Sequence, residues 1–245
     1  MVGSDDYSGP VRTPHPIEVE SYRILRATCD THGLPPHSRD VVERMVHTSA
    51  DESWCADLIL DESALAAGAA ALDGGAPLVV DAETVSAGIA AYPSLCLMES
   101  EAAYDISVRT GITLPAAGFQ LAASRVADGA VWVAGSSPTA LWELLRLAEG
   151  GVLRPALVIG LPAGFVGAAE AKAALRRSGL PAISNVSAKG VRWSRQRPST
   201  RCSTATSTEP RYPLTRAAGV AAMFEDSSCP GRPARGSGQR DAPPR

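Results

Sequence analysis

The residues best suited to acid–base chemistry lie in the segment RMVHTSAD, residues 44–51. The helical pattern before His47 places it in the last turn of a helix, where the negative end of the helix dipole stabilises an imidazolium. A histidine of this kind can donate a proton near neutral pH. Arg44, three residues earlier on the same face, opposes that stabilisation but could bind a substrate carboxylate. From the residues alone, His47 is either a structural histidine or the acid–base group of a site.

Two further segments carry polar residues where predicted strands end. In DAET, residues 81–84, Asp81 and Glu83 could form an acid pair, although an Asp at a strand end is more often a helix N-cap. In GSSPTAL, Ser136 or Ser137 can cap a helix that begins near Pro138. Free N–H groups at that helix start could hold an anion, and simple capping is the favoured alternative.

The segment GLPAGFVGAAEAK contains Gly160, Gly164 and Gly167 but fits neither a dinucleotide fingerprint nor a P-loop. Its glycines could admit a bulky ligand close to the backbone, or they could let a helix pack tightly on a sheet. No Gly-x-Ser-x-Gly elbow is present either. The sequence therefore predicts neither nucleotide binding nor a serine nucleophile.

The five cysteines are scattered and odd in number, and no pair has ligand spacing. They indicate neither a disulfide framework nor a zinc site. Cys29, His32 and His37 flank a proline-rich loop, but no further ligand is spaced to complete a metal site. The N-terminus lacks a signal pattern and no apolar run reaches membrane-spanning length, so we expect a cytoplasmic protein that does not enter a membrane.

Two spacing patterns predict the fold. Short apolar runs predict five strands, at residues 76–81, 95–98, 130–135, 155–160 and 181–186. Helical periodicity fills most of the intervals, at residues 62–72, 112–126, 138–148 and 166–177. Apolar strands that alternate with helices are typical of a parallel sheet buried on both faces. We therefore predict a three-layer α/β/α fold with a five-stranded parallel sheet, whose ligand crevice lies beyond the carboxyl ends of the strands.

Further helices precede this sheet. The stretch PIEVESYRILRATCD predicts a helix with an apolar face formed by Ile17, Tyr22, Ile24, Leu25 and Cys29. Ser38 is the expected cap of a second helix, which contains His47. Ser49 and Glu52 have the spacing of a capping box that would start a third.

Charge divides the chain. Through Gly190 there are 13 Lys and Arg against 22 Asp and Glu, and from Val191 onward 10 Arg against four acids, which together give the net charge of −3. We predict a flexible lead-in at residues 1–15, an α/β domain at 16–190 and a disordered Arg/Pro/Ser-rich tail at 191–245. The acidic domain argues against nucleic-acid binding by the fold itself, and recruitment of nucleic acid or an acidic partner by the tail is a less favoured reading.

Several motifs occur in the order and spacing of one family. They are ESYRIL, RMVHTSAD, PLVVDAETVSAGI, GSSPTALWELL and ALVIGLPAGFVGAAEAKAAL. Over residues 16–189 the chain resembles precorrin-8X methylmutase of cobalamin biosynthesis. The resemblance implies a flavodoxin-like fold and a homodimer with its site near the subunit interface. It also implies a cofactor-free isomerase that moves a methyl group from C11 to C12 of the tetrapyrrole macrocycle, giving hydrogenobyrinate; some members act on the cobalt-containing analogue.

The resemblance also assigns roles to residues. His47 aligns with the catalytic histidine, which would act as a proton donor. Residues expected to contact the substrate are Ser21, Arg44, Thr84, Ser136, Ser137, Thr139, Gly164 and Gly167. No metal ligands are implied, because a sigmatropic methyl shift needs a rigid pocket and one proton donor.

Two departures from the family pattern stand out. Relatives carry Thr-Arg-Ser where this chain has Thr113-Leu114-Pro115, and loss of a charge-assisted contact by that arginine could cost about 1.5–3 kcal/mol of binding. Relatives also end in an Ala-rich helix, whereas this chain continues from Val191 with Arg, Ser, Thr and Pro. We hypothesise a shifted reading frame near Gly190, which sequencing of the locus tests. A corrinoid-binding relative with weak or no turnover is the alternative function.

Overall fold

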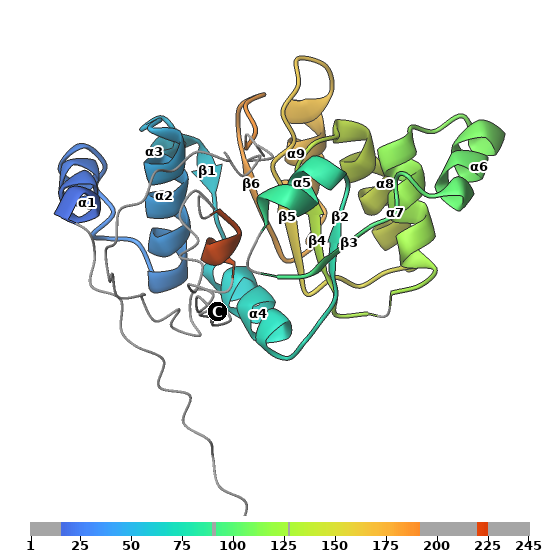
Figure 1. The fold of residues 1–245 in the computed structure, drawn as a ribbon, viewed down its shortest axis with the longest axis horizontal. Coiled ribbons are helices and arrows are strands. Elements are labelled where there is room, and N and C mark those ends of the chain that lie inside the picture. The colour runs from blue at the N-terminus through green and yellow to red at the C-terminus, as the bar shows by residue number, and fades with distance from the viewer. Residues whose placement is uncertain (1–15, 90–91, 127, 192–219, 225–245) are drawn as a thin grey trace, which may run out of the picture.

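A six-stranded sheet organises the chain in a computed structural model that describes residues 16–89, 92–126, 128–191 and 220–224 (Figure 1). The strands are β1 (Leu58–Ile59), β2 (Leu78–Val80), β3 (Ser94–Cys96), β4 (Val131–Ala134), β5 (Leu157–Gly160) and β6 (Ala182–Asn185). Their order is β1-β6-β5-β4-β2-β3. Strands β2 to β6 pair in parallel, and β1 pairs antiparallel with β6.

The five predicted strands are all present, and the predicted three-layer α/β/α fold is confirmed. Taken alone, the parallel strands have the 2-1-3-4-5 order of flavodoxin-like folds. The predicted strand count was one too low. Strand β1 has only two residues and lies at the edge of the sheet, so it is too short to produce a periodic signal in the sequence.

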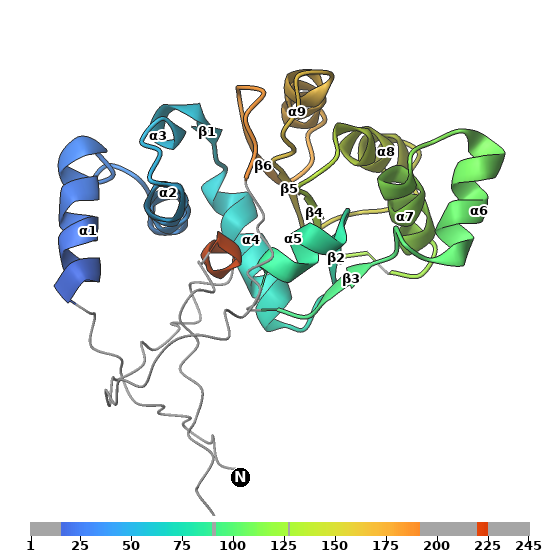
Figure 2. The same cartoon turned by 45° about the horizontal axis from the view of Figure 1, so that its top comes forward.

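Alternate residues of each central strand enter two separate cores. Val131 and Val133 of β4 face the core beneath α4, whereas Trp132 and Ala134 face the core beneath α8. Such two-sided burial explains the unbroken apolar runs. Gly68 lets α4 lie close to β5, since a Cβ there would clash with the Leu157 side chain. Figures 1 and 2 show helices on both sides of the strands.

Most helices lie close to their predicted positions, but those at residues 83–88 and 101–110 were not predicted. They are α1 (Pro16–Thr28), α2 (Pro36–Ser49), α3 (Trp54–Asp57), α4 (Glu62–Asp73), α5 (Glu83–Gly88), α6 (Glu101–Thr110), α7 (Leu114–Ala123), α8 (Pro138–Glu149) and α9 (Ala168–Arg177). Two predicted caps are wrong. Helix α2 is capped by Glu62, whose carboxylate accepts the backbone N–H groups of His37 and Ser38. Ser49 donates back to the carbonyl of Met45 instead of capping α3.

The predicted apolar face of α1 is only partly covered. Leu25 and, just beyond the helix, Cys29 are buried, but Ile17 is 74% and Ile24 51% exposed. Helix α1 lies at one end of the molecule beside α2 (Figure 2). An exposed apolar helix face such as this one is typical of a surface that another apolar surface covers.

One part of the predicted tail packs against the body. Val220, Met223 and Phe224 are buried in the core on the α2 side of the sheet, and the Thr48 hydroxyl donates to the Phe224 carbonyl at 2.9 Å. The expectation of a disordered tail therefore does not hold for residues 220–224. The lead-in at 1–15 and the rest of the tail lie outside the described residues.

Two cysteines that seemed unrelated in the sequence form a pair. Cys29 and Cys55 are joined in a disulfide across a separation of 26 residues, with their Cα atoms 6.3 Å apart. The expectation of no disulfide is thus corrected, because folding of α1 onto α2 and α3 brings the two positions together. The predicted cytoplasmic location stays a prediction, and the oxidation state of this pair in cells bears on it.

Reduction of the Cys29–Cys55 bond is expected to lower the free energy of unfolding by about 3–4 kcal/mol, because it opens the loop that the bond closes and the unfolded chain gains conformational entropy. Urea unfolding with and without reductant measures the change. The double variant Cys29→Ser/Cys55→Ser should not respond to reductant, while Cys96→Ala should respond like the parent. Equal parent stability in both conditions would contradict the expectation.

Among the residues that the structure describes, no helix has the length and apolar character needed to cross a bilayer.

Candidate functional site

His47 meets α1 through two contacts. It lies in the last turn of α2, as predicted, and its Nδ1 is 3.0 Å from the Ser21 hydroxyl oxygen. The Tyr22 ring stacks on the imidazole, with centroids 4.6 Å apart and planes 10° apart. The hydroxyl sets the hydrogen bonding of Nδ1 and the stack fixes the ring plane, so Nε2 is the nitrogen left to face a ligand.

A charged pair behind Tyr22 holds the two helices together. Arg26 of α1 donates twice to the Glu43 carboxylate of α2, at 3.0 and 2.7 Å, and the Thr31 hydroxyl donates to the same carboxylate at 2.7 Å. Burial would raise the pKa of Glu43, but these hydrogen bonds lower it below its usual value. The Arg26 guanidinium also lies 5.5 Å from the Tyr22 ring centroid. The Tyr22 ring therefore contacts both a fixed cation and the imidazole.

Sequence reasoning missed the role of Tyr22, which it assigned only to an apolar face. The signal was present in part, since Ser21 and Tyr22 are adjacent and the family motif ESYRIL includes both. Arg44 is half-buried one turn before His47. Its predicted contact with a substrate carboxylate stays a prediction.

Asp81 organises the loop between β4 and α8. Its carboxylate accepts the backbone N–H groups of Gly135, Ser136 and Ser137 at 3.1, 2.9 and 2.7 Å. These N–H groups lie in the segment that the sequence offered to an anionic ligand, and the protein's own carboxylate occupies them. Asp81 does not cap the helix that follows it, whose N-cap residue is Ala82; it instead holds the loop that leads into α8, and Ser137, the N-cap residue of α8, makes no side-chain cap.

Burial raises the pKa of Asp81 to about 6, although the three N–H donors lower it. Between about pH 4 and 6 the folded protein thus holds a proton that the unfolded chain has released. The stability that this proton contributes is present below pH 4 and is lost as the pH rises through 6, a change of about 3 kcal/mol.

The variant Asp81→Asn removes this titration. From pH 4 to pH 7 the unfolding free energy of the parent should fall by about 3 kcal/mol relative to that of the variant. Urea unfolding at several pH values measures the difference. Asp128→Asn is the matched control, because Asp128 also accepts a backbone N–H, from Arg154, in an exposed position. Parallel pH profiles for parent and Asp81→Asn would contradict the assignment.

A row of hydroxyl groups follows this loop. The Thr139 hydroxyl oxygen lies 2.7 Å from that of Ser137 and 2.6 Å from that of Thr113, at the start of α7. Sequence reasoning noted Thr113 only as part of a departure from the family pattern. The neighbouring Leu114 begins α7, so the position where the resemblance predicts an arginine lies beside these hydroxyls. Thr84 is exposed in the first turn of α5.

The loop between β5 and α9 carries the predicted glycines. Gly167 has φ +77°, a conformation that favours glycine, and Gly164 lies close to Pro138 at the start of α8. Between them, Phe165 and Val166 are almost fully exposed. This loop therefore adjoins the hydroxyl row and presents apolar side chains at the carboxyl edge of the sheet.

The predicted site residues form two groups in the described structure. Ser21, Arg44 and His47 lie on α1 and α2 at one end of the molecule. The other group consists of Thr84, Ser136, Ser137, Thr139, Gly164 and Gly167. Figure 1 places α1 and α2 on the opposite side of β5 and β6 from α8, where much of the second group lies. Within one chain, the helices that carry the candidate acid are therefore separated from α8 by these two strands.

Comparison with known proteins gives a consistent result. The precorrin-8X methylmutase family profile matches residues 16–192. A cobalt-precorrin-8 methylmutase of Methanocaldococcus jannaschii is 36% identical over 150 residues, 61% of this chain and 71% of the relative. A precorrin-8X methylmutase of Sinorhizobium sp is 33% identical over 179 residues, 70% of this chain and 85% of the relative. The crystal structure of the Thermus thermophilus precorrin-8X methylmutase, 29% identical, aligns with a TM-score of 0.66 over 85% of this chain and 92% of that one.

Proposed function

The chain belongs to the precorrin-8X methylmutase family, and we propose that it is an isomerase of cobalamin biosynthesis. Its reaction moves a methyl group from C11 to C12 of the macrocycle and gives hydrogenobyrinate. The observation that carries the proposal is the contact of His47 with Ser21 and Tyr22, because it prepares one imidazole to donate a proton from a fixed direction. The relatives include proteins named for precorrin-8X and for cobalt-precorrin-8, and either tetrapyrrole is a candidate substrate.

His47 acts as the proton donor in the imidazolium form. Its Nδ1–H then donates to the Ser21 oxygen, and its Nε2–H is free to donate to the conjugated ring system. The Tyr22 face stabilises the positive ring during this step. As the methyl group leaves C11 and bonds to C12, the borrowed proton biases the electron distribution, and it returns to His47 afterwards. The proton count is unchanged, as an isomerisation requires.

We also propose a homodimer in which each site draws on both chains. His47 and Ser21 of one copy would face the β4–α8 and β5–α9 loops of the other. Two observations support this arrangement: α1 and α2 lie on the opposite side of β5 and β6 from α8, and Ile17 and Ile24 leave the apolar face of α1 exposed. A second copy would cover that face and complete the site.

A corrinoid-binding protein with weak or no turnover is the second candidate. Leu114 favours it, because this residue replaces an arginine beside the hydroxyls of Thr113 and Thr139. Loss of that charge would weaken the hold on a substrate carboxylate.

Incubation of the purified protein with precorrin-8X, followed by absorption spectroscopy, separates the two candidates. Conversion of the substrate spectrum to that of hydrogenobyrinate supports the isomerase. Binding without conversion supports the corrinoid-binding alternative. The same assay with the cobalt-loaded analogue identifies the preferred substrate.

A further inference from the structure

A short segment after β6 contacts both the turn beyond His47 and the β5–α9 loop. We call this segment, residues 187–191, the strap. It follows the orange strand β6 in Figure 1. The Ala188 carbonyl accepts the Gly164 N–H at 3.1 Å, and the Val191 N–H donates to the Leu161 carbonyl. Gly190 packs against the backbone of this same loop, where any Cβ would clash. The backbone of the strap is therefore fixed against the end of β5.

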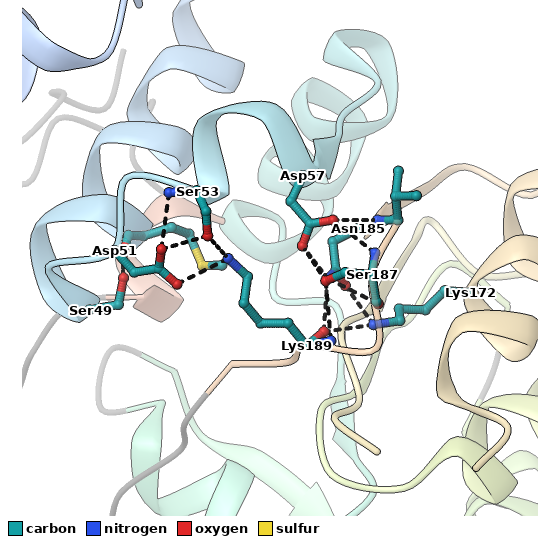
Figure 3. A network of polar contacts seen from close by, with 10 residues as sticks. Ser49, Asp51, Ser53, Asp57, Lys172, Asn185, Ser187 and Lys189 are labelled. Carbon is teal, nitrogen blue, oxygen red and sulfur yellow. Dashed lines mark hydrogen bonds and ion pairs between the residues drawn. The ribbon is translucent and has the colours of Figure 1, made fainter. Parts of the chain in front are cut away.

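A network of polar side chains, two of them buried, holds the strap from its other side (Figure 3). The ammonium of Lys172, a fully buried side chain, donates to the Lys189 carbonyl at 2.7 Å and to the Asn185 side-chain oxygen at 2.8 Å. Asn185 and Ser187 both donate to the Asp57 carboxylate at 2.7 Å. Burial would raise the pKa of Asp57, but these hydrogen bonds lower it below its usual value. An anchored backbone of this kind gives the Lys189 side chain a fixed starting point.

The Lys189 side chain reaches from this anchor to the turn between α2 and α3. Its ammonium lies 3.0 Å from an Asp51 carboxylate oxygen, 2.6 Å from the Ser53 hydroxyl and 3.9 Å from the Trp54 ring centroid. Figure 3 shows Asp51 and Ser53 directed at this ammonium. Because Trp54 is buried, the cation is held on a rigid surface as well as by two hydrogen bonds.

The turn that Lys189 holds begins where the helix of His47 ends. Helix α2 finishes at Ser49, Ala50 adopts a left-handed conformation with φ 50°, and Asp51 follows. We propose that Lys189 is a positioning residue that fixes the last turn of α2, and with it the direction in which His47 presents its proton. This inference rests on the proposed function, in which His47 is the acid.

The contact between Lys189 and Asp51 is better suited to positioning than to stability. The Lys189 and Asp51 side chains are 27% and 38% exposed, and ion pairs this accessible contribute little to folding. Yet the Lys189–Asp51 bond joins residues that are 138 apart in sequence. It connects the strap to the turn after α2, and the position of that turn affects the geometry of His47. Small displacements of a catalytic group are costly to rate, even where the fold is retained.

The test compares Lys189→Met, which removes the charge, with Lys189→Arg, which can restore both the ion pair and the stack on Trp54. Arg146→Met is the matched control, because the exposed Arg146 pairs with Glu143 within α8, away from the strap. We expect Lys189→Met to lower kcat about 10-fold, with the affinity for hydrogenobyrinate within about twofold of the parent. Lys189→Arg should recover most of kcat, and Arg146→Met should match the parent.

A second readout does not depend on turnover. In protein labelled with ¹³C-histidine, the imidazole signal of His47, assigned by its absence in His47→Ala, should shift in Lys189→Met but not in Arg146→Met. If the parent shows no conversion, the proposed function fails, and this signal alone then decides the role of Lys189. An unchanged kcat or His47 signal in Lys189→Met, no recovery in Lys189→Arg, or unfolding of Lys189→Met would overturn the proposal.

Discussion

Purified His47→Ala protein is expected to convert precorrin-8X about 10²–10⁴-fold more slowly than the parent protein, because general acid catalysis supplies a factor of that size. In the alanine variant Ser21 and Tyr22 remain, but they contact the imidazole at Nδ1 and at its face, not on the Nε2 side. Initial rates at saturating substrate, followed by the change in absorption, give the ratio directly.

Two companion variants make the His47 result specific. Ser21→Ala keeps the imidazole but removes the partner of Nδ1, so its loss of kcat should be smaller than that of His47→Ala. Circular dichroism and hydrogenobyrinate affinity close to those of the parent would show that each variant still folds and binds. Equal turnover by His47→Ala and the parent would remove this residue from the mechanism.

Mixing two inactive variants is expected to restore about a quarter of the parent activity, if each site takes residues from two copies. One variant is His47→Ala and the other is Gly164→Glu. A Cβ at Gly164 would meet Ala168 and Pro138 at an ordinary 3.6 Å, so the fold accommodates a side chain there. The added carboxylate would occupy the proposed face for the macrocycle and repel the carboxylates of the substrate.

The arithmetic of the mixture makes this experiment decisive. Random reassortment gives half mixed dimers, and each mixed dimer holds one site with both intact groups. The activity of each variant alone, measured at the same total concentration, is the control. No activity in a mixture that size-exclusion chromatography shows to contain mixed dimers would mean that both groups serve one site from the same chain.

Local sequence patterns determined most of the architecture. The five apolar runs became β2 to β6, and the helical stretches between them became α4, α7, α8 and α9. The position of His47 in the last turn of α2 was also predictable. These features follow from periodicity over a few residues, which a single sequence records. Elements with a short or mixed signal, such as β1 and α5, were not predicted.

The partners of the polar groups were decided only by the tertiary structure. Asp81 accepts the backbone N–H groups that lead into α8, and Glu62 caps α2. Lys189 reaches a turn 138 residues earlier in the chain, and Cys29 meets Cys55. Each such pairing joins segments whose separation in space depends on how helices and strands pack. Spacing along the sequence shows which groups can donate or accept, but long-range packing decides which of them meet.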